Sequence, residues 1–209
     1  MLTGKFITIE GGEGAGKSTN ISFIKNYLEQ HEIEVVLTRE PGGTPLSERL
    51  REILLDKNET NMSSDTELLL MFAARSQHLS EVIIPAIQDG KWVICDRFTD
   101  ATYAYQGGGR GISTERIAAL ENWVQGDLRP DMTIVFDLPI EVGLTRANSR
   151  SEPDRFEQEN IDFFTRVRNA YLERAGKFPA RYAIINAEPQ LDIVQQELLK
   201  VLKRLVQAA

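Results

Sequence analysis

Near the N-terminus, the chain carries a glycine-rich segment of a type that binds phosphate. Residues 11–18 read GGEGAGKS and match the pattern G-x-x-x-x-G-K-[ST]. Glycines let such a backbone wrap with its N–H groups pointing at phosphate oxygens, and the following helix adds the positive end of its dipole. We expect Lys17 to reach the β- and γ-phosphates and the Ser18 hydroxyl to bind Mg²⁺. The alternative is a glycine turn with a solvated lysine. The predicted nucleoside-triphosphate site consists of Gly11, Gly12, Glu13, Gly14, Ala15, Gly16, Lys17, Ser18 and Thr19.

The charges of the chain predict a second anion site. The 209 residues include 24 Lys and Arg against 31 Asp and Glu, a formal net charge of −7, which disfavours general nucleic-acid binding. An acidic body with a cationic pocket suits a small, multiply charged anion. Arginines that recur beside glycine-rich or aromatic segments could form that pocket: Arg39, Arg75, Arg97, Arg110, Arg146, Arg150 and Arg155.

Short β-branched runs alternate with helical stretches, which predicts an α/β fold with a parallel sheet covered on both faces. Arg39 and Asp96 directly follow two of these runs, and parallel sheets place ligands at the carboxyl ends of their strands. The five strand candidates are residues 6–9, 35–38, 92–95, 133–136 and 182–185.

Helical spacing and capping signals fill the intervals between these strands. Apolar residues at helical spacing follow the glycine-rich segment over residues 21–28. Residues 64–67 (SDTE) read as a capping box that opens a helix through Leu79. We expect Pro85 to kink or end that helix and Gly90 to close it. A last amphipathic helix is predicted from about Asp192.

Several classes of protein are disfavoured by what the sequence lacks. There is no Asn-Lys-x-Asp motif of a GTPase, and a 209-residue chain leaves little room for the coupled domains of an ATP-driven motor, so we expect a single domain over residues 1–209. The single cysteine, Cys95, cannot form an internal disulfide. No apolar run approaches the ~20 residues that span a membrane, and no signal peptide is recognisable. We expect a cytoplasmic protein with neither membrane nor nucleic-acid partners.

Six ordered blocks give the chain a family resemblance. They are residues 9–18 (IEGGEGAGKS), 38–44 (TREPGGT), 70–75 (LMFAAR), 96–98 (DRF), 104–111 (AYQGGGRG) and 129–131 (RPD). With these blocks, the chain from Phe6 to about Leu202 resembles the bacterial thymidylate kinases among the nucleoside monophosphate kinases. The resemblance implies the three-layer P-loop NTPase fold with a short mobile lid. It also implies phosphorylation of dTMP to dTDP with MgATP as donor, in dTTP synthesis, by a homodimer.

The resemblance also assigns roles in acceptor binding. It makes Arg39 a clamp on the acceptor phosphate, Phe72 the ring that stacks on thymine, and Arg75 a donor to a base carbonyl. From the residues alone, Arg39 could instead pair with Glu40, and Phe72 could belong to the core. His78, on the same helical face, is interpreted as structural.

Further roles fall on the segments after the third strand. The family pattern lets Arg97 bind the acceptor phosphate and bridge to the transferred group, and Asp96 suits indirect Mg²⁺ orientation or proton acceptance. An Asp–Arg pair that only holds the loop is the alternative. The resemblance suggests that Thr102 lies near the base N3 edge, that Tyr105 lies over the sugar face that lacks a 2′-hydroxyl, and that Gln106 makes a polar contact. The residues expected to bind the acceptor substrate are Glu13, Arg39, Phe72, Arg75, Arg97, Thr102, Tyr105 and Gln106.

The last predicted group is a catalytic arginine. The family places Glu13 against the acceptor's 3′-hydroxyl or a magnesium-bound water, and this chain has Gly14 where some relatives carry a catalytic arginine. Residues 146–155 contain three arginines among Ser and Pro, which indicates either a solvated loop or a mobile lid that brings an arginine to the γ-phosphate. We favour Arg150, then Arg155. The glycines of residues 107–109 could form a flexible loop tip.

Two alternatives to a dTMP kinase remain at this stage. One is another nucleoside monophosphate kinase, with dUMP, dCMP or AMP as the acceptor. The other is a non-catalytic nucleotide-binding switch.

Overall fold

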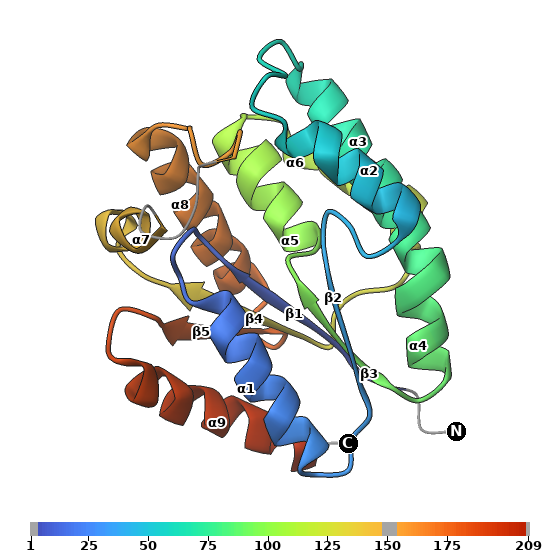
Figure 1. The fold of residues 1–209 in the computed structure, drawn as a ribbon, viewed down its shortest axis with the longest axis vertical. Helices are drawn as coiled ribbons and strands as arrows, with labels where there is room; N and C mark the ends of the chain where they lie inside the picture. Colours follow the sequence, from blue (N-terminus) through green and yellow to red (C-terminus); the bar gives the residue numbers. More distant parts are fainter. Residues whose placement is uncertain (1–3, 148–153, 208–209) are drawn as a thin grey trace.

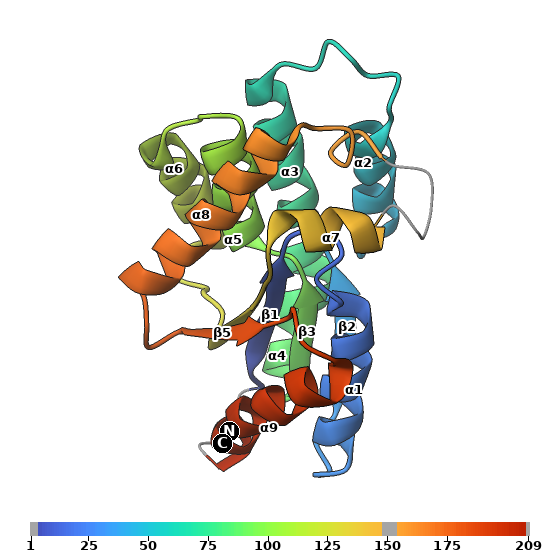
Figure 2. The ribbon, with the colours of Figure 1, turned by 90° about the vertical axis from the view of Figure 1, so that its left-hand side faces the viewer.

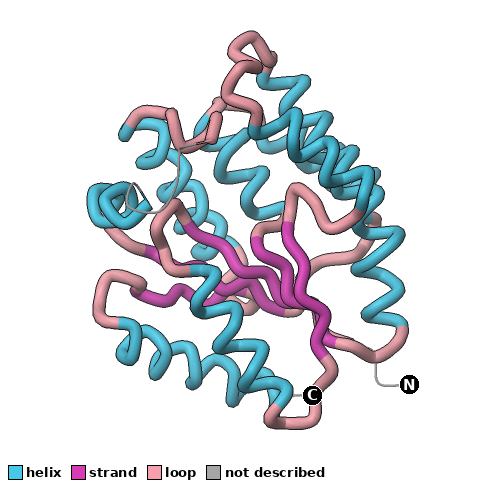
Figure 3. Tube along the Cα trace, in the orientation of Figure 1, coloured by secondary structure: helices cyan, strands magenta, loops and turns pink. Residues whose placement is uncertain are grey.

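A parallel sheet forms the centre of the molecule. The computed structural model describes residues 4–147 and 154–207. The strands are β1 (Phe6–Gly11), β2 (Val35–Arg39), β3 (Trp92–Asp96), β4 (Met132–Asp137) and β5 (Tyr182–Asn186). They are parallel in the order β2-β3-β1-β4-β5 (Figures 1 and 3). The five predicted strands are therefore confirmed.

Helices cover both faces of the sheet and rise beyond the carboxyl ends of its strands, as Figure 2 shows. The helices are α1 (Lys17–Glu29), α2 (Pro45–Leu55), α3 (Ser64–His78), α4 (Ile84–Gln88), α5 (Thr99–Thr102), α6 (Thr114–Gln125), α7 (Ile140–Ala147), α8 (Ile161–Lys177) and α9 (Leu191–Gln207). Two π-helical segments, η1 (Leu79–Ile83) and η2 (Tyr103–Gly109), continue α3 and α5. None of the helices in the described parts of the chain combines the length and the apolar character needed to cross a bilayer.

Alternate strand residues divide the core between the two faces. Ile9, Ile94 and Ile134 belong to a buried cluster with residues of α1 and α9. Their neighbours Val93 and Cys95 point the other way, into a cluster with residues of η1. Because successive strand side chains alternate between faces, both faces of the sheet are apolar. The expected three-layer α/β architecture is confirmed.

Two details of the third helix differ from the sequence prediction. The cap of α3 is Ser63, whose hydroxyl oxygen accepts from the Thr66 amide at 3.1 Å, so the predicted cap at Ser64 is one residue late. Pro85 does not end the helical path, because it lies in the first turn of α4 directly after η1. The closure by Gly90 (φ +80°) fits the prediction.

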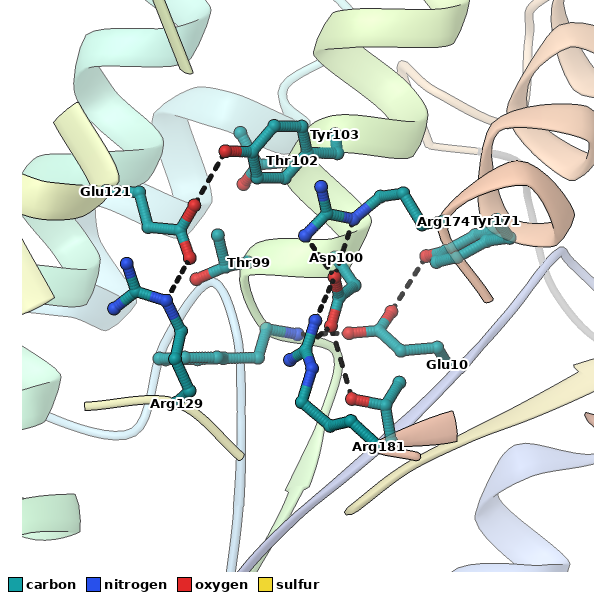
Figure 4. Close-up of polar contacts among 12 residues, drawn as sticks. Glu10, Thr99, Asp100, Thr102, Tyr103, Glu121, Arg129, Tyr171, Arg174 and Arg181 are labelled. Atoms are coloured by element: carbon teal, nitrogen blue, oxygen red, sulfur yellow. Dashed lines mark hydrogen bonds and ion pairs between the residues drawn. The ribbon is translucent and has the colours of Figure 1, made fainter. Parts of the chain in front are cut away.

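A buried ionic cluster holds α5 against α8 and β5 (Figure 4). The Asp100 carboxylate accepts from Arg174 Nε at 2.7 Å, from Arg181 Nη1 at 3.3 Å and from the Tyr182 hydroxyl. Burial acts to raise the pKa of Asp100, but the charges of Arg174 and Arg181 outweigh it and lower that pKa. The cluster fixes the segment that leads from β3 into η2.

Candidate active site

The carboxyl ends of β1, β2 and β3 open into a cavity of about 260 Å³. Side chains from the segments 13–18, 40–41, 96–106 and 154–157 and from α2 and α3 line it. It lies where open parallel sheets bind ligands. The structure thus brings the glycine-rich loop and the predicted acceptor segments around one space.

The glycine-rich loop joins β1 to α1 in a conformation that needs its glycines. Gly14 and Gly16 have φ values of +68° and +77°, which other residues rarely adopt. Lys17 Nζ donates to the carbonyl oxygens of Gly11 and Gly12, at 3.0 and 2.9 Å. Burial, followed by the charge of Arg97, lowers the pKa of Lys17. Its amine therefore lies across the loop, where phosphate oxygens can replace the two carbonyls.

Not every residue of the predicted triphosphate site faces this cavity. Residues 13–18 line it, whereas Gly11, Gly12 and Thr19 do not, and the Thr19 side chain is exposed. The first two still contribute through the carbonyls that hold Lys17.

Glu13, Arg97 and Tyr105 form a hydrogen-bonded triangle beside the loop. Glu13 Oε1 accepts from Arg97 Nη2 at 2.5 Å and from the Tyr105 hydroxyl at 2.9 Å, and that hydroxyl also accepts from Arg97 Nη1 at 2.8 Å. Burial acts to raise the pKa of Glu13, but the charges of Arg97 and Lys17 bring it down to about 2. Glu13 is therefore ionised and is turned toward the acceptor segments.

Arg75 of α3 also lines the cavity and is almost fully buried. Its Nε donates to Glu40 Oε2 at 2.7 Å and its Nη2 donates to Thr102 Oγ1 at 3.0 Å. Its buried Nη1 has no hydrogen-bond partner among the described residues. Since Arg75 and Thr102 both line the cavity, this nitrogen is a donor in need of an acceptor. Gln106 also lines the cavity and donates to Glu67 Oε1 at 2.8 Å.

Phe72 occupies a different place from the one expected. It is 2% exposed, lies in an apolar cluster, and does not line the cavity. Its ring centroid is 4.7 Å from Arg75 Cζ, so it supports the guanidinium instead. Met71, four residues before Arg75, lines the cavity in its place. Residues three and four positions before Arg75 both lie on its side of the helix, and the sequence prediction considered only Phe72, three positions before.

Arg39 also lies away from the cavity. It pairs with Glu48 at 2.8 Å and is half exposed, whereas Arg51 of α2 lines the cavity. Burial and the charge of Arg39 lower the pKa of Arg51. The suggested pair of Arg39 with Glu40 is not formed, because Glu40 is buried against Arg75. Sequence reasoning missed Arg51, whose only signal was a cationic position on the helix after the glycine turn.

The predicted lid arginines divide between described and undescribed residues. Arg150 lies outside the described residues. Arg146 donates to the carbonyl oxygens of Ala187 and Glu188, each at 2.8 Å. Arg155 donates to the Leu54 carbonyl at 2.8 Å and does not line the cavity, although its neighbours Asp154, Phe156 and Glu157 do.

The glycines after Gln106 do not form a flexible tip. They belong to η2, and a Cβ on Gly109 would lie 2.4 Å from the Phe163 ring of α8. Arg110 pairs with Glu67 and Glu159 and does not line the cavity. Close packing against α8 explains the need for glycine here.

The residues near the loop fit a hydrated Mg²⁺. Asp96 Oδ1 is buried without a hydrogen-bond partner among the described residues, and Ser18 lines the same cavity. No group of three or more His, Cys, Asp or Glu side chains gathers as a metal cage in the parts of the chain that the structure describes. Mg²⁺ at phosphate sites retains waters and takes only one or two protein oxygens, so this donor set is sufficient.

Comparison with known proteins gives the family. A thymidylate kinase family model matches residues 9–198. The chain belongs to the thymidylate kinase family. It is 61% identical over 206 residues to the thymidylate kinase of Pseudomonas syringae pv. tomato and 59% identical over 206 residues to that of Pseudomonas putida, in each case covering 99% of this chain and 98% of the relative.

Solved structures agree with this assignment. A crystal structure of thymidylate kinase from Ehrlichia chaffeensis superimposes with a TM-score of 0.78 at 35% identity, covering 96% of this chain and 99% of that one. Both the family resemblance and the fold expected from the sequence are thereby confirmed. As a thymidylate kinase, the chain is a transferase of nucleotide biosynthesis that phosphorylates dTMP to dTDP.

Proposed function

We propose that the cavity binds MgATP at the glycine-rich loop and dTMP at its other end, with the two phosphate groups meeting beside Arg97. The observation that carries this proposal is that Lys17 and Arg75, from distant parts of the chain, line one cavity. A phosphate oxygen of dTMP attacks the γ-phosphorus, the bond to the β-phosphate oxygen breaks, and ADP leaves. The protein contributes positioning and positive charge.

On the donor side, Lys17 exchanges its two carbonyl partners for β- and γ-phosphate oxygens. The residues at 11–19 supply backbone N–H groups and the start of α1, which favours negative charge. Ser18 and Asp96 would hold Mg²⁺, which when bound would neutralise phosphate charge.

On the acceptor side, cationic side chains hold the phosphate of dTMP. Arg97 contacts this phosphate and the transferred group, and Arg51 joins it because it lines the cavity. Arg39 can take part only by leaving Glu48. Glu13, held by Arg97 and Tyr105, faces the acceptor 3′-hydroxyl.

Thymine lies at the Arg75 end. Arg75 Nη1 donates to the base O4, and Thr102 Oγ1, which already accepts from Arg75, lies at the N3 edge. Cytosine carries an amino group at the O4 position, so a donor-only guanidinium rejects it. Gln106 adds a polar contact to the nucleotide, and Met71 covers one face of the thymine ring. Phe72 packs against the Arg75 guanidinium.

Tyr105 sets the sugar preference. Its ring lines the cavity, and its hydroxyl is fixed between Glu13 and Arg97. A ring held in this way excludes a 2′-hydroxyl sterically.

A lid arginine completes the charge around the γ-phosphate. Arg155 is held by a hydrogen bond to Leu54 and an ion pair with Glu67 and does not line the cavity, which favours Arg150 for this role. An Arg150→Ala variant would lower kcat more than dTMP affinity, and a pure binding defect would count against the assignment.

The remaining proposals concern the protein as a whole. We propose a cytoplasmic homodimer whose chain is one domain over residues 1–209. The exposed Leu69 of α3 and Trp123 of α6, on two helices in contact, favour a second copy as partner. Sedimentation at several concentrations tests the dimer.

An acceptor panel tests the proposed chemistry. Purified protein with ATP would convert dTMP to dTDP faster than dUMP, dCMP or AMP to their diphosphates, and only with Mg²⁺ present. ATP binding without any phosphorylated acceptor would indicate a nucleotide-binding switch instead.

A further inference from the structure

A series of hydrogen-bonded polar side chains runs from the half-buried Thr38 of β2 through the buried His78 and Glu40 to Arg75, and none of the roles above uses Thr38, His78 or Glu40. We propose that His78 is a positioning residue for base selection: acting through Glu40, it fixes the Arg75 guanidinium and so sets the preference for thymine over cytosine. This inference rests on the proposed role of Arg75 at the base.

The hydrogen bonds of His78 define which of its nitrogens carries a proton. The ring is fully buried, with Nδ1 3.0 Å from Glu40 Oε1 and Nε2 2.6 Å from Thr38 Oγ1. A carboxylate only accepts, so Nδ1 is the donor toward Glu40. Nε2 faces the Thr38 hydroxyl, which can either donate or accept a hydrogen bond. The imidazole therefore joins Glu40 to Thr38, with one ring nitrogen facing each of them.

Glu40 divides its two oxygens between His78 and Arg75. Oε1 faces the imidazole, and Oε2 accepts from Arg75 Nε at 2.7 Å. Rotation of the carboxylate would break one of these bonds in a buried place, where an unsatisfied polar group is costly. The orientation of the carboxylate, and hence of the guanidinium, depends on the Nδ1–H donor.

Arg75 is held on its remaining sides as well. Its Cζ lies 4.7 Å from the Phe72 centroid and 5.0 Å from the Phe98 centroid, and Nη2 donates to Thr102. With Nε on Glu40 and Nη2 on Thr102, Nη1 is the guanidinium nitrogen that has no hydrogen-bond partner among the described residues. Loss of the His78 donor would let Glu40 turn and the guanidinium tilt, so that Nη1 no longer meets the base oxygen.

The loop that carries Glu40 also rests on the imidazole. A Cβ on Gly43 would lie 2.5 Å from His78 Nε2, and Gly43 has a φ of +87°. His78 thus contributes to packing as well as to orientation. A test must separate the two contributions.

Two substitutions of His78 distinguish the roles of its two ring nitrogens. In His78→Asn the amide nitrogen falls near the position of Nδ1, and in His78→Gln it falls near that of Nε2. We expect His78→Asn to keep the ratio of kcat/KM for dTMP over dCMP within about twofold, because the donor to Glu40 is retained. His78→Gln should lower that ratio about tenfold, mainly through a higher KM for dTMP, with KM for ATP unchanged. His31→Gln, at the exposed histidine, is the matched control.

The outcomes distinguish this inference from its premise. If both variants keep the ratio, or lose it equally, His78 acts by packing alone and the positioning role is wrong. If Arg75→Lys leaves the ratio unchanged, the proposed role of Arg75 is wrong whatever His78 does.

A measurement on the unaltered protein covers the case in which a variant does not fold. Nitrogen-15 NMR of the histidine rings should show the proton of His78 on Nδ1, exchanging slowly, with its resonance shifted when dTMP binds but not when ATP binds. A ring without a proton on Nδ1, or a resonance insensitive to dTMP, would overturn the proposal.

Discussion

Glu10 of β1 offers a quantitative test of how the site is supported. Its side chain is fully buried, and its Oε1 accepts from the Phe98 amide at 2.8 Å, next to Arg97 with its φ of +65°. The Tyr171 hydroxyl donates to Oε2 at 2.8 Å (Figure 4). Burial, with the nearby charge of Asp100, raises the pKa of Glu10 to about 8. At neutral pH the folded protein therefore holds this carboxyl largely protonated, whereas the unfolded chain does not.

The pKa shift of Glu10 sets the size of the expected effect. A raised folded-state pKa contributes stability that is complete below the unfolded pKa of 4.5 and is lost as pH rises toward 8. Glu10→Gln removes this titration but keeps an oxygen for the Phe98 amide and a donor toward Tyr171. Each pKa unit corresponds to roughly 1.4 kcal/mol, so between pH ~5.5 and pH ~7.5 the wild type should lose on the order of 2 kcal/mol of unfolding free energy relative to the variant.

Urea unfolding of both proteins at these two pH values measures the difference. Other titrating groups affect both proteins alike, so only the change in their difference is compared. We expect the stability of the variant relative to wild type to increase with pH. Parallel stability profiles would mean that Glu10 titrates normally, and a decreasing difference would mean that the folded protein prefers its ionised form.

The other predictions concern turnover and binding. Lys17→Ala should keep the fold and lower kcat about 10²-fold or more; near-normal turnover of the folded variant would refute its role. Gly143→Ala would place a Cβ 2.5 Å from the carbonyl oxygen of Glu13 and displace the phosphate-binding loop, so kcat should fall about tenfold or more. Gly176→Ala, which has open space around it, is the control and should leave kcat unchanged; equal activities of the two variants would show that the Gly143 contact is unimportant. Met71→Ala should raise KM for dTMP about tenfold, and Phe72→Ala should mainly lower the denaturation midpoint; the reverse pattern would return Phe72 to the base.

The fold and the donor half of the site could be predicted because their signals are local. The β-branched runs, the glycine-rich loop and its lysine each specify their structure within a few residues. The direction of an individual side chain is not local in the same way. From the sequence, Arg39 and Arg51 are equally good candidates to bind the acceptor phosphate. The packing of α2 decides that Arg51 lines the cavity and that Arg39 pairs with Glu48.

Buried polar contacts were equally hard to predict. Glu40 stands beside a Pro-Gly-Gly turn, which suggests an exposed carboxylate, yet it lies between Arg75 and His78. These partners come from a helix that begins more than twenty residues later. Sequence spacing gives no measure of such tertiary pairing, so the link from His78 to Arg75 emerges only from the structure.

A crystal structure with dTMP and a non-hydrolysable ATP analogue tests the central claim most directly. We expect Arg75 Nη1 within hydrogen-bonding distance of the thymine O4, the acceptor phosphate against Arg97, and the γ-phosphate at Lys17. A thymine ring bound outside the space between Met71 and Thr102, or an acceptor phosphate remote from Arg97, would contradict the account.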